Sequence, residues 1–161
     1  VYFTHSGNTE LAAKQVAEAT GARMIKLLPE QPYSSEDVNW TNKQSRCTQE
    51  HLNRSLRPAI KPIDIDFAKI DTLFVGFPIW WYDLPMPVWS FLEEYDLSGK
   101  TIIPFFTHNG SSSGASSIST VAELCPDSTV LTDDYFTYSG NNVDEAESAV
   151  DEWLTELGYN N

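Results

Sequence analysis

The residues that decide the fold are Val1-Tyr2-Phe3-Thr4-His5-Ser6-Gly7-Asn8-Thr9. A short apolar run leads directly into a small polar turn. A helix pattern follows the turn, because apolar residues recur on one helical face and Gly21 stands where a C-terminal cap belongs. The apolar positions of that face are Leu11, Ala12, Ala13, Val16 and Ala17. A strand that passes through a tight turn into a helix is the first unit of an alternating α/β fold.

The rest of the chain repeats this alternation. The patterns predict strands at 1–3, 23–28, 71–77, 101–107 and 129–136, and helices after Thr9, at 87–95, at 116–124 and at 143–157. Such a chain is expected to form a doubly wound α/β fold, with a five-stranded parallel sheet in the order 2-1-3-4-5 and helices on both faces. Pro104 predicts an edge or a bulge in its strand, and Asn142 is the expected cap of the last helix.

The length of 161 residues fits a single domain over 1–161. The segment 30–62 interrupts the alternation, because it is polar and has weak periodicity. A helix from about Ser35 to Asn53 is one interpretation, since no Gly or Pro intervenes there. A mobile excursion is the other interpretation.

Composition excludes several classes of protein. Apolar residues make up 41% of the chain, enough for a packed core, and no stretch approaches the roughly 18 consecutive apolar residues of a membrane-spanning helix. The formal net charge is −13. A surface this acidic repels nucleic acid and anionic lipid, so neither is an expected partner, whereas a basic-surfaced protein is.

Neither the two cysteines nor the first residue indicates a function. Cys47 and Cys125 lie far apart without metal-ligand spacing, so no zinc site is expected. Two free thiols are expected, with one disulfide as the alternative. Because Val1 is not preceded by Met, we expect that a start, signal or tag preceded it. The localisation stays open, with the cytoplasm as the favoured alternative, and the oligomeric state stays open too.

The first turn has the features of an anion site. It follows the carboxyl end of a strand, where open α/β sheets bind their ligands. Thr4, Ser6 and Thr9 offer hydroxyl groups, Gly7 permits close backbone approach, and Asn8 tolerates a tight turn. Free amides and the helix dipole can hold a phosphate without Lys or Arg, although a polar turn without any ligand gives the same pattern. The missing P-loop motif argues against a nucleoside triphosphate and favours one terminal phosphate.

The spacing of six residues carries a family resemblance. They are Tyr2, Thr4, Gly7, Thr9, Ala13 and Val16. The chain resembles the flavodoxin family in this signature, and specifically the flavodoxin-like branch whose phosphate loop reads Thr-His-Ser-Gly-Asn-Thr, at 4–9 here. The similarity continues through 76–81, 85–87, 96–100 and 104–108, and omits the 30–60 excursion. It implies noncovalent binding of FMN, with the phosphate on Thr4, Ser6, Gly7, Asn8 and Thr9 and a contact from His5.

A second candidate segment follows the third expected strand. It supplies Pro78, Ile79, Trp80, Trp81 and Asp83. The flat side chain of one of the two Trp residues is expected to stack on the flavin ring, and the sequence does not decide which. Asp83 accepts a hydrogen bond from the polar edge of the ring or is a solvated turn residue. The alternative is that these aromatic side chains fold over the core or form a patch for a partner.

A third candidate segment follows the fourth expected strand. By resemblance it covers the polar edge of the flavin with Thr107, His108, Gly110, Ser111 and Gly114. A flexible linker without a ligand is the alternative. His108 is a candidate proton donor, although a lone His is more often structural.

The same loop contains a hydrolase-like motif. Gly110-Ser111-Ser112-Ser113-Gly114 matches the nucleophile elbow, with Ser112 as the nucleophile. The elbow requires a later His, and the three histidines, His5, His51 and His108, all precede Ser112. A hydrolase with Ser112 as its nucleophile is therefore not expected.

The predicted function is that of an FMN-binding redox protein that transfers electrons. Its expected partner is a redox protein with a basic surface, or a small-molecule electron acceptor. The alternative is an NAD(P)H-dependent quinone or flavin reductase that uses bound FMN. No second nucleotide motif is recognisable, which favours the carrier, and whether the chain is an enzyme stays open. A binding module without flavin is a third hypothesis.

Overall fold

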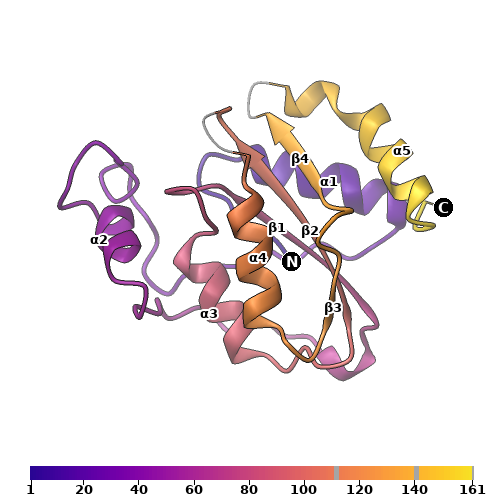
Figure 1. The fold of residues 1–161 in the computed structure, drawn as a ribbon, viewed down its shortest axis with the longest axis horizontal. Helices are drawn as coiled ribbons and strands as arrows, with labels where there is room; N and C mark the ends of the chain where they lie inside the picture. Colours follow the sequence, from indigo (N-terminus) through magenta and orange to yellow (C-terminus); the bar gives the residue numbers. More distant parts are fainter. Residues whose placement is uncertain (111–112, 140–141, 161) are drawn as a thin grey trace.

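The computed structural model describes residues 1–110, 113–139 and 142–160. In order its elements are α1 (Asn8–Thr20), α2 (Arg46–Leu52), the 3-10 turn η1 (Phe67–Lys69), β1 (Thr72–Pro78), α3 (Met86–Glu94), β2 (Thr101–His108), α4 (Ala115–Leu124), β3 (Thr129–Val130), β4 (Phe136–Ser139), the 3-10 turn η2 (Val143–Glu145) and α5 (Glu147–Glu156). From β1 to β3 its strands and helices alternate along the chain (Figure 1).

The sheet is parallel and has β2 at its centre. β1 pairs with β2 in register from Thr72 opposite Thr101 to Pro78 opposite Thr107. On its other side β2 pairs first with β3 and then with β4, both parallel. The predicted α/β class with a parallel sheet is therefore confirmed, in a sheet of four strands.

The first two expected strands are shorter than predicted. Tyr2 forms single parallel bridges to Lys26 and to Gly76, so residues 1–3 lie between 23–28 and β1 without extending into full strands. The apolar run at 1–3 ends at the polar turn, which limits pairing to one residue. The fifth expected strand is split into β3 and β4, because residues 131–135 include Asp133 and Asp134, which strands disfavour.

Pro104 lies in the central strand, so the expectation of a sheet edge or a bulge is wrong. The backbone N–H of Leu131 donates to the carbonyl of Ile102, which shows that even-numbered residues of β2 turn their backbone groups toward β3 and β4. Pairing on that side resumes only at Phe105, opposite Phe136. Pro104, which has no N–H, therefore lies beside the gap between β3 and β4.

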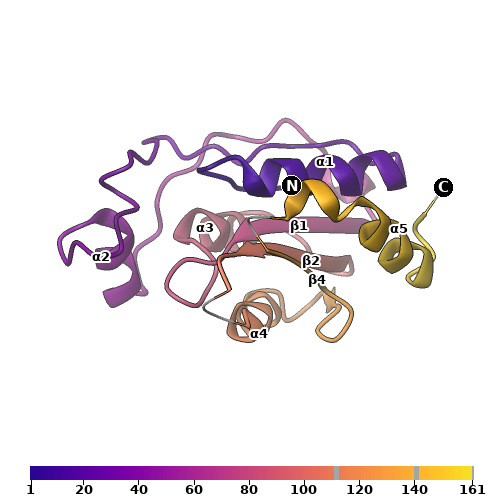
Figure 2. The same cartoon turned by 90° about the horizontal axis from the view of Figure 1, so that it is seen from above.

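Helices cover both faces of the sheet. Figure 2 shows α1 and α5 over one face and α4 over the other. Side chains of α3 and α4 pack on one core with Phe77 and Phe106, whereas those of α1 and α5 pack on a second core with Ile103 and Phe105. Figure 1 shows α2 at the side of this layered body, close to the end of β1.

The segment 30–62 contains one short helix, α2, which covers only part of the range from about Ser35 to Asn53 that one of the two interpretations gave to a helix. Side chains before α2 form local turns instead. The Asn39 carboxamide oxygen accepts the backbone N–H of Thr41 at 3.1 Å, and that of Asn42 accepts the N–H of Gln44 at 2.9 Å. Such bonds compete with helical bonds, which is why the helix begins only at Arg46.

The last helix begins later than predicted. Asn142 precedes the 3-10 turn η2, and its backbone carbonyl, not its side chain, accepts the N–H of Glu145 at 3.1 Å. The α-helix then starts at Glu147. The apolar face nevertheless points inward as expected, because Val143, Val150 and Leu154 are buried.

The structure also shows the state of the two cysteines and whether its helices could span a membrane. Cys47 and Cys125 are both buried and free, which confirms the expectation of two thiols. Burial raises the pKa of the Cys125 thiol to about 11. Among the residues that the structure describes, no helix has the length and apolar character needed to cross a bilayer.

Candidate functional site

The three predicted loops meet at one cavity at the carboxyl ends of the parallel strands. Its volume is about 480 Å³. Nine of the predicted residues line it: His5, Ser6, Asn8, Pro78, Ile79, Trp80, Trp81, Thr107 and His108. The other predicted residues that the structure describes lie outside this lining: Thr4, Gly7, Thr9, Asp83, Gly110 and Gly114. Ser111 and Ser112 of the hydrolase-like motif are outside the described residues.

The polar turn places the start of α1 at the cavity. The Thr4 hydroxyl oxygen accepts the backbone N–H of Gly7 at 3.0 Å, which closes the turn. Gly7 has a φ of 98°, in the region that favours glycine, and no described side chain caps the helix behind it. Ser6 and Asn8 line the cavity beside this helix start. The helix N-terminus thus presents backbone amides and the positive end of its dipole, which suits an anion.

Thr9 joins the turn to the sheet. Its side chain is buried, and its hydroxyl lies 2.9 Å from the hydroxyl of Thr107, which lines the cavity. Thr9 therefore connects two of the three loops without lining the cavity itself. A phosphate contact from its hydroxyl stays a prediction.

The two Trp side chains form an aromatic wall, and each has its own packing partner. Trp80 packs edge-on against Phe3, with ring centroids 5.4 Å apart. Trp81 stacks on His51, with centroids 4.8 Å apart and planes within 7°. Burial and the nearby Arg54 lower the pKa of His51, which favours a neutral ring in this stack. Both Trp residues line the cavity, so which of them meets a ligand ring stays a prediction.

The turn that carries this wall has an unusual backbone. Trp80 and Asp83 exchange two backbone hydrogen bonds of 2.9 and 3.1 Å. Between them Trp81 has a φ of 48° and Tyr82 a φ of 66°, conformations that side chains other than glycine adopt at a cost. Trp81 and Tyr82 both line the cavity, so this tight turn contributes two of the lining residues.

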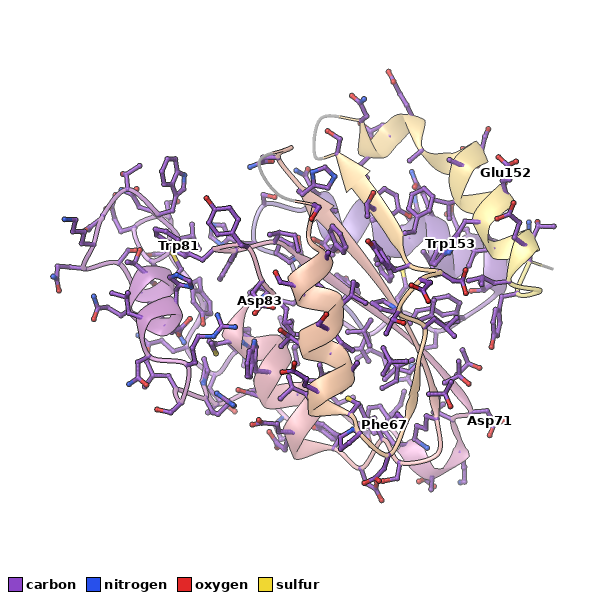
Figure 3. The ribbon with its side chains drawn as sticks, in the orientation of Figure 1. Phe67, Asp71, Trp81, Asp83, Glu152 and Trp153 are labelled. Carbon is purple, nitrogen blue, oxygen red and sulfur yellow. The ribbon has the colours of Figure 1, made fainter. Side chains whose placement is uncertain are left out.

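Asp83 turns its carboxylate to protein groups outside the cavity (Figure 3). It accepts hydrogen bonds from the Arg54 guanidinium, from the Thr120 hydroxyl at 3.1 Å and from the Leu84 backbone N–H at 2.8 Å. Asp83 therefore links three parts of the chain: segment 30–62, the turn from Trp80 to Asp83 (the aromatic turn) and α4. Its predicted bond to a flavin edge stays a prediction.

In the third loop His108 lines the cavity, and its Nδ1 accepts the backbone N–H of Gly110 at 2.9 Å. Gly114 caps the start of α4 with a φ of 67°. The two glycines therefore shape the backbone beside the cavity.

Five cavity residues were missed by sequence reasoning. They are Val38, Trp40, Cys47, Tyr82 and Asn109. Tyr82 and Asn109 stand inside the loops already singled out. Val38, Trp40 and Cys47 belong to segment 30–62, where a lone Trp in a polar stretch was the available signal.

Comparisons with known proteins identify the family and the fold. The family model described as Flavodoxin matches residues 1–157. A solved structure assigned as a flavoprotein of Bacteroides eggerthii DSM 20697 is 34% identical, with a TM-score of 0.85, 98% of this chain covered and 94% of that chain. A second, from Bacteroides uniformis ATCC 8492, is 32% identical, with a TM-score of 0.84 and coverage of 96% and 94%.

A more distant structure is a flavoprotein of Lactobacillus acidophilus NCFM in complex with FMN. It is 18% identical, has a TM-score of 0.67, and the match covers 89% of this chain and 93% of that chain, which shows a shared fold. A search of curated proteins finds no match. Since the family model spans residues 1–157 of 161, the chain belongs to the flavodoxin family.

Proposed function

We propose that the chain is an FMN-binding redox protein that transfers electrons through the bound cofactor. The observation that carries this proposal is the convergence of three loops on one cavity of about 480 Å³. Family membership and the FMN complex of the Lactobacillus acidophilus flavoprotein support the choice of FMN.

The residues at the cavity fit the parts of FMN. The start of α1, with Ser6 and Asn8, suits the phosphate, because backbone amides and the helix dipole attract an anion. Trp80 and Trp81 offer flat apolar surface for the ring. When bound, FMN supplies the redox chemistry, and the chain binds it, orients it and limits the access of water.

A comparison of FMN with riboflavin tests this assignment. Riboflavin has the same ring but no phosphate, so it loses the interactions at the start of α1. We expect FMN to bind at least about tenfold more tightly, because hydrogen bonds to a charged group contribute about 1.5–3 kcal/mol each. Titration of the apoprotein with each flavin, followed by flavin fluorescence, measures both affinities. Equal affinities would refute the phosphate site, and no binding of either would refute the proposed function.

A reductase fed by NAD(P)H is the second candidate function. The observation that favours it is the backbone of the aromatic turn, where Trp81 and Tyr82 are already left-handed and no Gly stands from Phe77 to Ser98. In many flavodoxins a backbone carbonyl of the corresponding loop rotates to accept a hydrogen bond when the flavin ring gains a proton. A glycine in the loop lowers the conformational cost of that rotation, because glycine tolerates positive φ. A turn without glycine favours uptake of two electrons together.

Stepwise reduction of the FMN-loaded protein separates the two candidates. Widely separated one-electron potentials would favour the carrier. Closely spaced potentials, together with oxidation of NAD(P)H in the presence of a quinone, would favour the reductase.

A further inference from the structure

Segment 30–62 forms a fourth wall of the cavity, in addition to the three loops at the strand ends. Val38, Trp40 and Cys47 line the same space as Trp80 and Trp81. None of the three loops supplies these residues. The polar excursion therefore contributes directly to the candidate flavin site.

The segment is attached to the aromatic turn, residue by residue. Tyr33 packs edge-on against Trp80 at 5.2 Å, His51 stacks on Trp81 at 4.8 Å, and Arg54 pairs with Asp83. Figure 3 shows Trp81 on the side of the turn that faces α2. Three successive contacts of different kinds fix the segment relative to the cavity.

Local hydrogen bonds also fix the backbone around Trp40. Both the N–H and the hydroxyl of Thr41 donate to the Asn39 side-chain oxygen, at 3.1 and 2.6 Å. The N–H of Cys47 donates to the carbonyl of Asp37 at 2.8 Å, which closes the loop that contains Trp40. Trp40 is thus carried by a folded loop with both ends anchored.

Trp40 itself is 69% exposed while it lines the cavity. Exposure of a large apolar side chain to water is unfavourable. A flat ligand that covers this side chain would bury its apolar surface, which favours binding. We propose that Trp40 packs against FMN when the cofactor binds, so that segment 30–62 is part of the flavin site. This inference rests on the proposed function, because it concerns the same cofactor in the same cavity.

Flavin affinity of three variants tests the proposal. We expect Trp40→Ala to weaken FMN binding by about tenfold or more, because it removes both apolar burial and an aromatic contact. Trp40→Phe should retain most of the affinity. Leu52→Ala is the matched control, since Leu52 is 71% exposed on the same segment but lies outside the cavity lining, and it should bind FMN as the wild type does.

Fluorine NMR of protein labelled with fluorotryptophan gives a second readout that does not depend on affinity. The resonance of Trp40 is assigned by its loss in Trp40→Phe, and the flavin ring current should shift it when FMN is added. Trp153 is the internal control, because it is a buried residue of α5, on the side of the molecule away from α2, and its resonance should stay in place (Figure 3).

The outcomes separate the two levels of the proposal. Wild-type protein that binds no FMN would refute the proposed function, and this inference with it. FMN that binds the wild type and Trp40→Ala equally, without moving the Trp40 resonance, would overturn the inference and leave the proposed function intact.

Discussion

Glu50 brings a carboxylate into the interior of segment 30–62. It is only 6% exposed. The Tyr33 hydroxyl donates to the carboxylate, within 2.8 Å of both oxygens, and the Arg46 guanidinium donates to one of them at 3.1 Å. Burial nevertheless raises the pKa of Glu50, and burial together with the nearby Glu50 charge raises the pKa of Tyr33. At a given pH, the protonated form of Glu50 is therefore more populated in the folded chain than in the unfolded chain.

This raised pKa predicts a direction for stability against pH. A carboxyl whose pKa is higher in the folded state contributes stability at pH values below its unfolded pKa, and that contribution is lost as the pH rises through the folded value. Glu50→Gln removes the titration and keeps an acceptor for Tyr33. We expect the variant to gain free energy of unfolding relative to the wild type as the pH rises from about 4, near the ordinary pKa of Glu, towards neutrality. Urea denaturation across this range measures the difference.

The control for this prediction is Glu18→Gln, because the Glu18 side chain is 64% exposed and pairs with Lys14 at 3.7 Å on the helix surface. Its difference from the wild type should vary little over the same range. A Glu50→Gln variant that follows the wild type at every pH would contradict the assignment of a costly buried charge.

The junction of β2, the third loop and α4 depends on a glycine that caps α4. A Cβ on Gly114 would lie 2.3 Å from the ring of Phe106, which is fully buried in the core. Gly114 also has a φ of 67°. Gly110, four residues earlier, has a φ of 83°, but a Cβ there would meet no described atom within 4 Å.

The two glycines therefore form a matched pair for mutagenesis. Gly110→Ala should lower the free energy of unfolding by about 1–2 kcal/mol, the cost of a left-handed alanine. Gly114→Ala should lower it by a further 1–3 kcal/mol or so, because the ring and the helix start must shift to relieve the overlap. Urea denaturation of the apoprotein compares them, and equal losses would mean that the Phe106 ring moves aside without cost.

Sequence periodicity predicted the elements whose own apolar residues form a clear pattern, either a continuous run or a helical spacing. β1 and β2 are nearly continuous apolar runs, and the face of α3 follows from the spacing of Val88, Phe91 and Leu92. The position of Pro104 at a gap between β3 and β4 was not predictable, because it depends on where two other strands end.

The candidate site divides in the same way. Residues in the turns directly after strands were predictable, because parallel strands bring their carboxyl ends to one edge of the sheet. Trp40 and Cys47 were not, because tertiary contacts such as the Arg54–Asp83 ion pair bring segment 30–62 to the cavity. Local pattern in a polar segment contains no information about such a contact.

Charge is a property of the whole molecule, and it bears on the partner. The chain has 23 acidic and 10 basic residues, for a formal net charge of −13. A negative field of this size attracts a basic protein and raises the rate of encounter, most strongly at low salt. Contacts formed after docking depend on shape and are less sensitive to salt, so the salt dependence isolates the encounter step.

Electron transfer from the reduced, FMN-loaded protein to a basic acceptor such as cytochrome c tests this steering. We expect the second-order rate constant to fall by about tenfold or more from low to high ionic strength, because the Debye length shortens from about 30 Å at 0.01 M to 3 Å at 1 M. A small neutral quinone is the control acceptor, since it has no charge to steer and its rate should change little. A cytochrome c rate that is independent of salt would rule out electrostatic steering by the acidic surface, and the flavin assignment would stand unaffected because it rests on the cavity.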